Sequence, residues 1–194
     1  MKHLGTETLL LIFLLFFISC EEGGKSSLEL FSGSHVRIPT NQMDLRFCSA
    51  YPDTLVHDAQ LRLFTYLDTT ECQTCQFPML IDIEKRVREG VYANKLKVIH
   101  IFRIQPENKE LLYKVLCHNN IRGTVYLDTC GIVEKENPLL KDNKLSHMFM
   151  INKDNRVVLI GNPFCNAFMR KQMRQVVKDE ICKTENDIDE TEKK

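Results

Sequence analysis

Cys72 and Cys75 are the residues of this chain best suited to chemistry, because two thiols separated by two residues can exchange a disulfide. An apolar, β-branched and aromatic run over residues 63–67 precedes them, and an amphipathic segment follows at once. At a helix start, thiols with this spacing close a disulfide with little backbone movement, and the N-terminal amides of the helix favour the thiolate form of the first. The pattern therefore predicts thiol–disulfide chemistry.

The elements that must position these thiols are predicted on both sides of them. The apolar run over 61–67 predicts a buried strand, and helical spacing of apolar residues predicts a helix that follows Cys75 and stops at Gly90. The other expected elements are an edge strand over 34–39, strands over 97–104 and 124–127, a helix that closes near Asn119, a mobile loop or irregular helix over 134–144, a β-hairpin over 148–160, and a last helix capped by Asn162 with Pro163 at its first position. This order predicts an α/β fold with a central mixed β-sheet flanked by helices.

The first twenty residues predict export and lipid attachment. Ten consecutive apolar residues, 9–18, follow Lys2 and reach about 15 Å as a helix, half of a bilayer core of roughly 30 Å. This length fits a signal peptide over 1–19 rather than a membrane-spanning helix. Phe17-Ile18-Ser19-Cys20 resembles a bacterial lipobox, so we expect Cys20 to be lipidated, with palmitate as an expected acyl chain, and 20–27 to be a flexible tether. The alternative is an ordinary signal peptide followed by an incidental cysteine.

Composition and cysteine count limit the remaining functions. Residues 28–182 are long enough for one domain with its own core, and the charged tail over 183–194 is predicted to be disordered. Twenty-six basic and twenty-six acidic residues give no net charge and no basic cluster, so nucleic acid is not an expected partner.

The cysteine count leaves most of the pairing open. With Cys20 lipidated, an odd number of cysteines remains. Five of them have no partner that the sequence identifies, and we expect these to be small buried hydrophobes: Cys48, Cys117, Cys130, Cys165 and Cys182.

With these elements in order, the chain resembles thioredoxin-fold proteins, specifically the redoxin or TlpA-like branch found in exported bacterial lipoproteins. The resemblance spans residues 61–181 and rests on four features. Three are segments: the strand that leads into Cys72-Gln73-Thr74-Cys75, the stretch Gly123-Thr124-Val125-Tyr126-Leu127-Asp128, and residues 148–158, which are similar to the family's TFLIDKDGKIV stretch. The fourth is a final helix that follows a short turn, as in the family. It implies a thioredoxin-like fold with no cofactor, in which Cys72 is the exposed nucleophile and Cys75 the buried resolving thiol. Cys130 follows the third strand of the parallel set, so it is expected near the reactive edge as an accessory redox thiol or a bystander.

Five positions depart from the family pattern. Glu71 stands where a Trp usually precedes the first cysteine, and its charge opposes thiolate formation. Gln73-Thr74 replaces the usual Gly-Pro or Pro-Pro, and Tyr66 replaces the buried carboxylate that assists proton transfer. Ser146 occupies the place of the cis-proline that holds the substrate backbone. The resemblance therefore favours the fold more strongly than it favours catalysis.

Three functions are compatible with this pattern. The first is a membrane-anchored thiol–disulfide oxidoreductase of the cell envelope, at the outer membrane or the periplasmic face, whose partners are disulfide-bearing exported proteins or a redox partner. The second is a non-catalytic thioredoxin-fold lipoprotein that acts as a binding or accessory module. The third makes Cys72 and Cys75 half of a zinc site, but no second Cys-x-x-Cys or close His pair supplies the other two ligands. The first of these is our prediction.

Overall fold

The computed structural model describes residues 26–48, 59–69, 72–90, 95–142 and 144–191. Within these ranges a six-stranded sheet has the order β1-β4-β3-β2-β5-β6. Its strands are β1 (Asp44–Arg46), β2 (Leu61–Leu67), β3 (Leu96–Arg103), β4 (Thr124–Asp128), β5 (Met148–Asn152) and β6 (Val157–Ile160). The helices are α2 (Ser27–Phe31), α3 (Phe77–Glu89), α4 (Lys109–His118), α5 (Ile132–Glu136), α6 (Pro138–Asp142) and α7 (Ala167–Thr191), with short 3₁₀ turns η1 (Thr40–Gln42), η3 (Thr74–Gln76), η4 (Pro106–Asn108) and η5 (Lys144–His147).

The sheet is mixed, as predicted. β2, β3 and β4 run parallel, which requires a crossover between each pair, and α3 and α4 provide these crossovers. β5 pairs antiparallel with β2, and β6 pairs antiparallel with β5, which closes the predicted hairpin. Almost every residue of β2 is buried, because helices cover both faces of the sheet at its centre.

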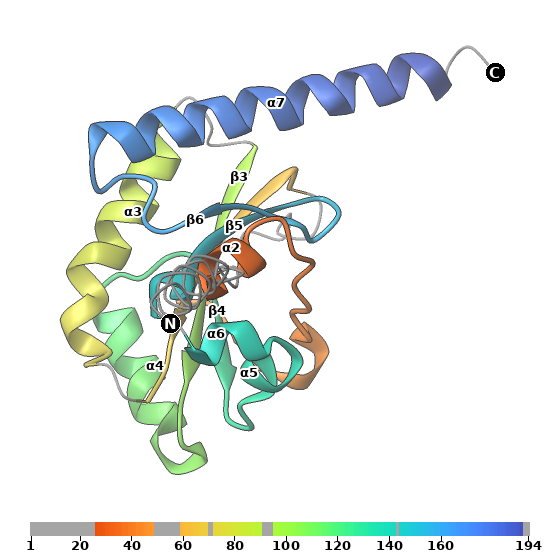
Figure 1. Cartoon of the computed structure of the whole chain (residues 1–194). Helices are drawn as coiled ribbons and strands as arrows, with labels where there is room; N and C mark the ends of the chain where they lie inside the picture. The colour runs from red at the N-terminus through yellow and green to blue at the C-terminus, as the bar shows by residue number, and fades with distance from the viewer. Residues whose placement is uncertain (1–25, 49–58, 70–71, 91–94, 143, 192–194) are drawn as a thin grey trace, which may run out of the picture.

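Helices lie on both faces of the sheet (Figure 1), and three apolar clusters pack them against it. One cluster packs residues of α2, α5 and α6 on the sheet face that carries Phe64 and Tyr66. The other two pack α3, α4 and the first half of α7 on the opposite face. β2 therefore lies in the middle of the molecule, and its carboxyl end leads into the segment with Cys72 and Cys75.

The structure corrects several expected elements near the chain ends. The edge strand is β1 rather than 34–39, where only His35 makes a single antiparallel bridge, to Arg156. Residues 134–144 contain parts of two short helices, α5 and α6. The last helix begins at Ala167, not Pro163: Asn166 accepts a hydrogen bond from Met169 N (2.9 Å), whereas the Asn162 side chain only closes a local turn with Phe164 N (2.8 Å).

The tail was expected to be disordered from residue 183, yet α7 continues as a helix to Thr191 and extends beyond the sheet (Figure 1). Its first half is anchored by Met173 and Val177 in the core, so the costly nucleation step is already complete and each further residue adds one hydrogen bond. None of the helices in the described ranges is long and apolar enough to cross a membrane. The predicted signal peptide and Cys20 lie outside the described residues.

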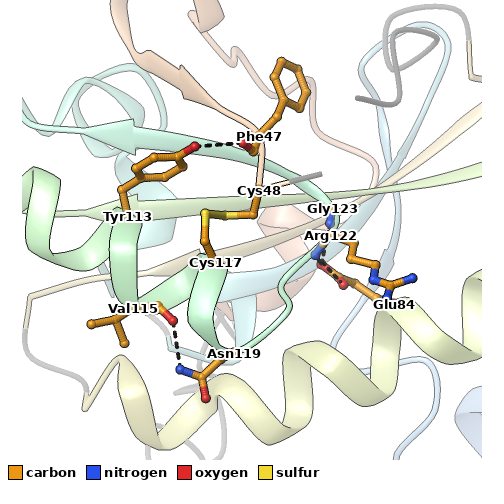
Figure 2. Close-up of a disulfide and its surroundings, with 9 residues drawn as sticks. All are labelled: Phe47, Cys48, Glu84, Tyr113, Val115, Cys117, Asn119, Arg122 and Gly123. Carbon is orange, nitrogen blue, oxygen red and sulfur yellow. Dashed lines mark hydrogen bonds between the residues drawn. A yellow bond between two sulfur atoms is a disulfide. The ribbon is translucent and has the colours of Figure 1, made fainter. Parts of the chain in front are cut away.

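A disulfide between Cys48 and Cys117 ties the segment after β1 to the last turn of α4, with the Cα atoms 4.8 Å apart (Figure 2). The same two elements are joined by Tyr113, whose hydroxyl donates to Phe47 O (2.9 Å). Cys48 and Cys117 were expected to be small buried hydrophobes, so this pair is a correction. Because the bridge joins residues 69 apart, it is of the kind that contributes about 2–4 kcal/mol by restricting the unfolded chain.

Two further cysteines also depart from the expectation of burial: Cys130 and Cys165 are exposed and lie in no disulfide. Both follow strand ends rather than occupying a core face; the sequence predicted this place for Cys130 but not for Cys165. The side chain of Cys182 lies outside the described part of the structure.

Candidate functional site

Cys72 and Cys75 form a disulfide, with their Cα atoms 5.3 Å apart, in the turn between β2 and α3. Cys75 N donates to Cys72 O (3.0 Å) and Gln76 N donates to Gln73 O (3.2 Å), so the pair is held in a tight turn ahead of the helix. Both residues are exposed, and the expectation that Cys75 is buried is wrong. The reason is that Cys75 lies in the 3₁₀ turn η3, one turn before α3 begins to pack on the sheet.

The start of α3 is fixed by its own sequence. Pro78 lies in the first turn, where a missing N–H costs least. Phe77 is buried and packs edge-on against Phe102 of β3, with ring centroids 6.4 Å apart. This contact anchors the helix directly after the disulfide.

Gln73 has a positioning role that sequence reasoning missed. Its amide Nε2 donates to Arg103 O (2.7 Å) at the end of β3 and to Asp68 O (3.3 Å) just past β2. The residue between the cysteines therefore joins the disulfide turn to two neighbouring strands. Thr74 Oγ1 lies 3.6 Å from Cys72 Sγ, within reach of a weak hydrogen bond. Glu71 lies outside the described residues.

Tyr66 was expected at the place of a buried carboxylate, and its surroundings keep its phenol neutral. Its side chain is buried and packs edge-on against the ring of His147, with the centroids 5.3 Å apart. Burial, together with the negative charges of Glu134 and Asp128, raises the pKa of the phenol far above its usual value. Tyr66 therefore stays neutral across the physiological range and does not act as an ionised base.

A cavity of about 230 Å³ lies beside the disulfide turn. Its lining includes Tyr66 and Leu67 from β2, Gln76 and Met79 next to the disulfide, and His147 and Met148 at the start of β5. Ser146, at the position expected for cis-proline, lies in η5 directly before β5, and no cis peptide bond occurs in the described part of the chain. The arrangement is an exposed disulfide next to a partly apolar hollow.

Cys130 lies at the same carboxyl end of the parallel strands, two residues after β4. β4 is two strands away from β2, so the strand ends are about 10 Å apart. The Asp128 carboxylate accepts hydrogen bonds from the backbone N–H groups of Cys130 (3.1 Å), Ile132 (3.0 Å) and Val133 (3.1 Å), and so caps α5. An exposed thiol therefore follows β4 at the end of the parallel strands where β2 leads into the disulfide turn, and its role there stays a prediction.

Arg103 joins the disulfide turn to the end of β4. Its guanidinium Nη1 donates to Asp128 O (3.1 Å), while its own carbonyl accepts from Gln73. Gly131, with a φ of +65°, permits this approach, because a Cβ atom there would lie 2.9 Å from Arg103 Nε. Gly131 was the one residue from which this close approach could have been expected in the sequence.

Comparisons with known proteins show the fold. No protein-family model matches the chain, and no curated protein matches it in sequence. A solved structure titled "putative electron transfer protein", from Aquifex aeolicus VF5, aligns with a TM-score of 0.50 and 12% identity, over 75% of this chain and 97% of that one. The exposed lipoprotein thioredoxin of Streptococcus pneumoniae strain TIGR4 aligns with a TM-score of 0.43 and 14% identity, over 63% and 87%.

The thioredoxin domain of a thiol-disulfide oxidoreductase from Bacteroides vulgatus aligns with a TM-score of 0.41 and 8% identity, over 62% of this chain and 81% of that one. At 12% identity, the alignment with the Aquifex aeolicus structure supports the architecture and nothing finer. The chain has a thioredoxin-like fold, with a Cys-x-x-Cys pair at the position where β2 leads into α3.

Proposed function

We propose that this protein is a thiol–disulfide oxidoreductase whose reacting groups are Cys72 and Cys75. The observation that carries the proposal is an exposed disulfide in a turn at the carboxyl edge of the parallel strands, beside a cavity that can receive a partner segment. Because the pair is exposed, a partner sulfur can reach it without any opening of the domain. The hydrogen bonds of Gln73 hold the turn in place during exchange.

The chemistry balances as a two-electron exchange. In the reduced form, the Cys72 thiolate attacks a sulfur of the partner's disulfide and releases the first partner thiolate. The Cys75 thiolate then attacks Cys72 Sγ in the mixed disulfide, which releases the second partner thiolate and forms the Cys72–Cys75 bond. The partner gains two electrons and two protons, and a second dithiol partner must reduce the pair again. The reverse sequence oxidises a dithiol.

A second candidate function is a non-catalytic binding or accessory module. One observation favours it: Tyr66 is a buried neutral phenol. The resemblance aligns Tyr66 with the carboxylate that assists proton transfer, and Ser146 with the cis-proline that holds the substrate, so in this proposal both groups are replaced. In that case the Cys72–Cys75 bond has a static structural role.

A redox titration separates the two functions. For the enzyme, we expect the Cys72–Cys75 pair to equilibrate between about −120 and −270 mV and to support reduction of insulin disulfides. The Cys165→Ser variant is the matched control and is expected to keep the same potential, because Cys165 is exposed but lies outside the disulfide turn. A pair that stays oxidised well below about −300 mV, or one without turnover, identifies the accessory module instead.

We also propose that the protein is attached to the cell envelope through lipid on Cys20 and acts on exported proteins. The support is the apolar leader and the lipobox-like Phe17-Ile18-Ser19-Cys20. A second disulfide, Cys48–Cys117, fits an oxidising compartment. Palmitate labelling that is present in the natural chain and lost in Cys20→Ser is the expected result; equal labelling of both chains contradicts the anchor.

A further inference from the structure

A separate cavity of about 390 Å³ lies on the sheet face that carries Phe64. Its floor is formed by Phe64 of β2, Ile99 of β3 and Tyr126 of β4, and residues 36–42, which we call the strap, form its roof. Arg62, near the start of β2, lines one wall. Five residues of extended strand, about 16 Å, separate Arg62 from the end of β2, so the cavity is distinct from the disulfide site.

The strap is held in place by hydrogen bonds to two other segments. Val36 N donates to Asn155 O (2.9 Å) in the β5–β6 turn. Asn137, between α5 and α6, accepts from Arg37 N (2.9 Å) and donates to Arg37 O (2.7 Å). The cavity is therefore preformed, and a ligand that enters it does not have to order its roof.

Arg62 brings a positive charge that no carboxylate neutralises within the described part of the chain. Its Nη2 donates to two neutral oxygens, Asn152 O (2.9 Å) and Asn155 Oδ1 (2.8 Å). Its Nε is buried and has no hydrogen-bond partner among those residues. Burial, with no opposing influence from an acidic side chain, lowers the pKa of the guanidinium. A half-buried cation in this state is stabilised by an anion.

The other charges at the cavity cancel. Arg37 and Glu136 both line it, and they form an ion pair of 3.1 Å with each other. The lining therefore carries one net positive charge, from Arg62, over an apolar floor. An inorganic anion would leave Phe64 and Ile99 uncovered, whereas a ligand with an apolar body would cover them.

We propose that this cavity binds a small organic acid, with its carboxylate on Arg62 and its apolar body against Phe64 and Ile99. Arg62 Nη1 makes no hydrogen bond within the described part of the chain, so it can donate a charge-assisted hydrogen bond to the carboxylate. The cavity lies within the usual range for small-molecule sites, about 300–1,000 Å³. Ligand binding here is independent of the exchange chemistry proposed for Cys72 and Cys75.

Calorimetric titration of the full chain with benzoate, benzyl alcohol and phenyl phosphate tests the proposal. Benzoate is expected to bind in a saturable manner, and the neutral benzyl alcohol about tenfold more weakly or less. Backbone NMR shifts on adding benzoate are expected at the strap and at Phe64 and Ile99, and not at Cys72. No saturable benzoate binding, shifts confined to the disulfide turn, or tighter binding of the dianionic phenyl phosphate would each overturn the proposal.

The sharpest variant is Asn155→Asp, which places a carboxylate where Asn155 Oδ1 now accepts from Arg62 at 2.8 Å. Asn155 has a φ of +60°, which aspartate also tolerates, so the fold is expected to survive and the melting temperature to rise. Benzoate affinity is expected to fall about tenfold or more, because the guanidinium is then already neutralised.

Arg62→Gln is expected to lose benzoate binding as well, whereas Arg86→Gln on the exposed side of α3 serves as the matched control and keeps it. If Arg62→Gln fails to fold, Asn155→Asp and the benzyl alcohol comparison still decide the question. Unchanged benzoate affinity in Asn155→Asp contradicts the assignment.

Discussion

Replacing Cys72 with serine is expected to lower disulfide-reductase turnover by roughly a hundredfold or more, because the first step of exchange requires its thiolate. Replacing Cys75 instead is expected to block only the second step. The Cys75→Ser variant should therefore accumulate a mixed disulfide with its partner, visible as an added mass that disappears on treatment with reductant. Turnover in an insulin-reduction assay and intact-mass analysis measure the two effects.

The assignment of roles has a direct structural test, since both Cys72 and Cys75 are exposed in the disulfide. A mixed disulfide trapped in Cys72→Ser rather than in Cys75→Ser would reverse the roles of nucleophile and resolving thiol. Cys165→Ser is the control, because Cys165 is likewise exposed but lies outside the disulfide turn. Full activity in Cys72→Ser would contradict the proposed enzyme altogether.

Replacing Glu84 with alanine is expected to lower the free energy of unfolding by about 3–5 kcal/mol. Glu84 is buried on the inner face of α3 and accepts hydrogen bonds from His100 Nε2 (2.9 Å), Arg122 N (2.9 Å) and Gly123 N (2.7 Å) (Figure 2 shows the last two). His100 is itself fully buried, and its Nδ1 lies 2.7 Å from Thr65 Oγ1. Removing the carboxylate leaves buried donors from β3 and from the segment before β4 without an acceptor.

Such a loss is a large fraction of the about 5–15 kcal/mol by which a domain is stable. Urea unfolding followed by circular dichroism measures it. Glu89→Ala is the matched control, since Glu89 is exposed on the same helix and its loss is expected to stay within about 0.5 kcal/mol. Equal stability of the two variants would contradict a structural role for the buried carboxylate.

The lowered pKa of Glu84 also predicts how the stability of the protein changes with pH. Burial raises its pKa, but the hydrogen bond and charge of His100 and the backbone N–H groups of Arg122 and Gly123 outweigh burial and hold the pKa below its ordinary value of 4.5. A carboxyl with a lowered pKa in the folded state contributes stability above pH 4.5 and loses it as the pH falls through the folded pKa. The stability difference between the natural chain and Glu84→Gln is therefore expected to narrow below pH 4.5.

Local patterns in the sequence were sufficient to predict the elements around the disulfide. β2 has the predicted bounds, α3 ends as expected before Gly90, and the turn between β5 and β6 forms the hairpin. These elements are encoded by apolar periodicity and by turn residues within a few positions of one another. The thioredoxin-like fold follows from their order, because short connections leave few ways to arrange alternating strands and helices.

Long-range contacts decided the remaining features. The choice of β1 as the edge strand depends on pairing with β4, about eighty residues later, and nothing within 44–46 announces that pairing. The same holds for the Cys48–Cys117 bridge, and for Asn137, which joins the strap to the segment between α5 and α6. In each case the partner lies far away in the chain, so local propensity carries no information about it.

By itself, the sequence determined that two thiols would lie at the end of a buried strand and at the start of a helix, because strand burial and helix initiation are local properties. Only the tertiary structure decided how those thiols are presented: both are exposed, and Gln73 fastens their turn to β3. It also decided that Arg62 faces a cavity without a carboxylate partner in the described residues. Exposure, charge compensation and enclosed volume arise from several distant segments at once, and only the packed chain brings those segments together.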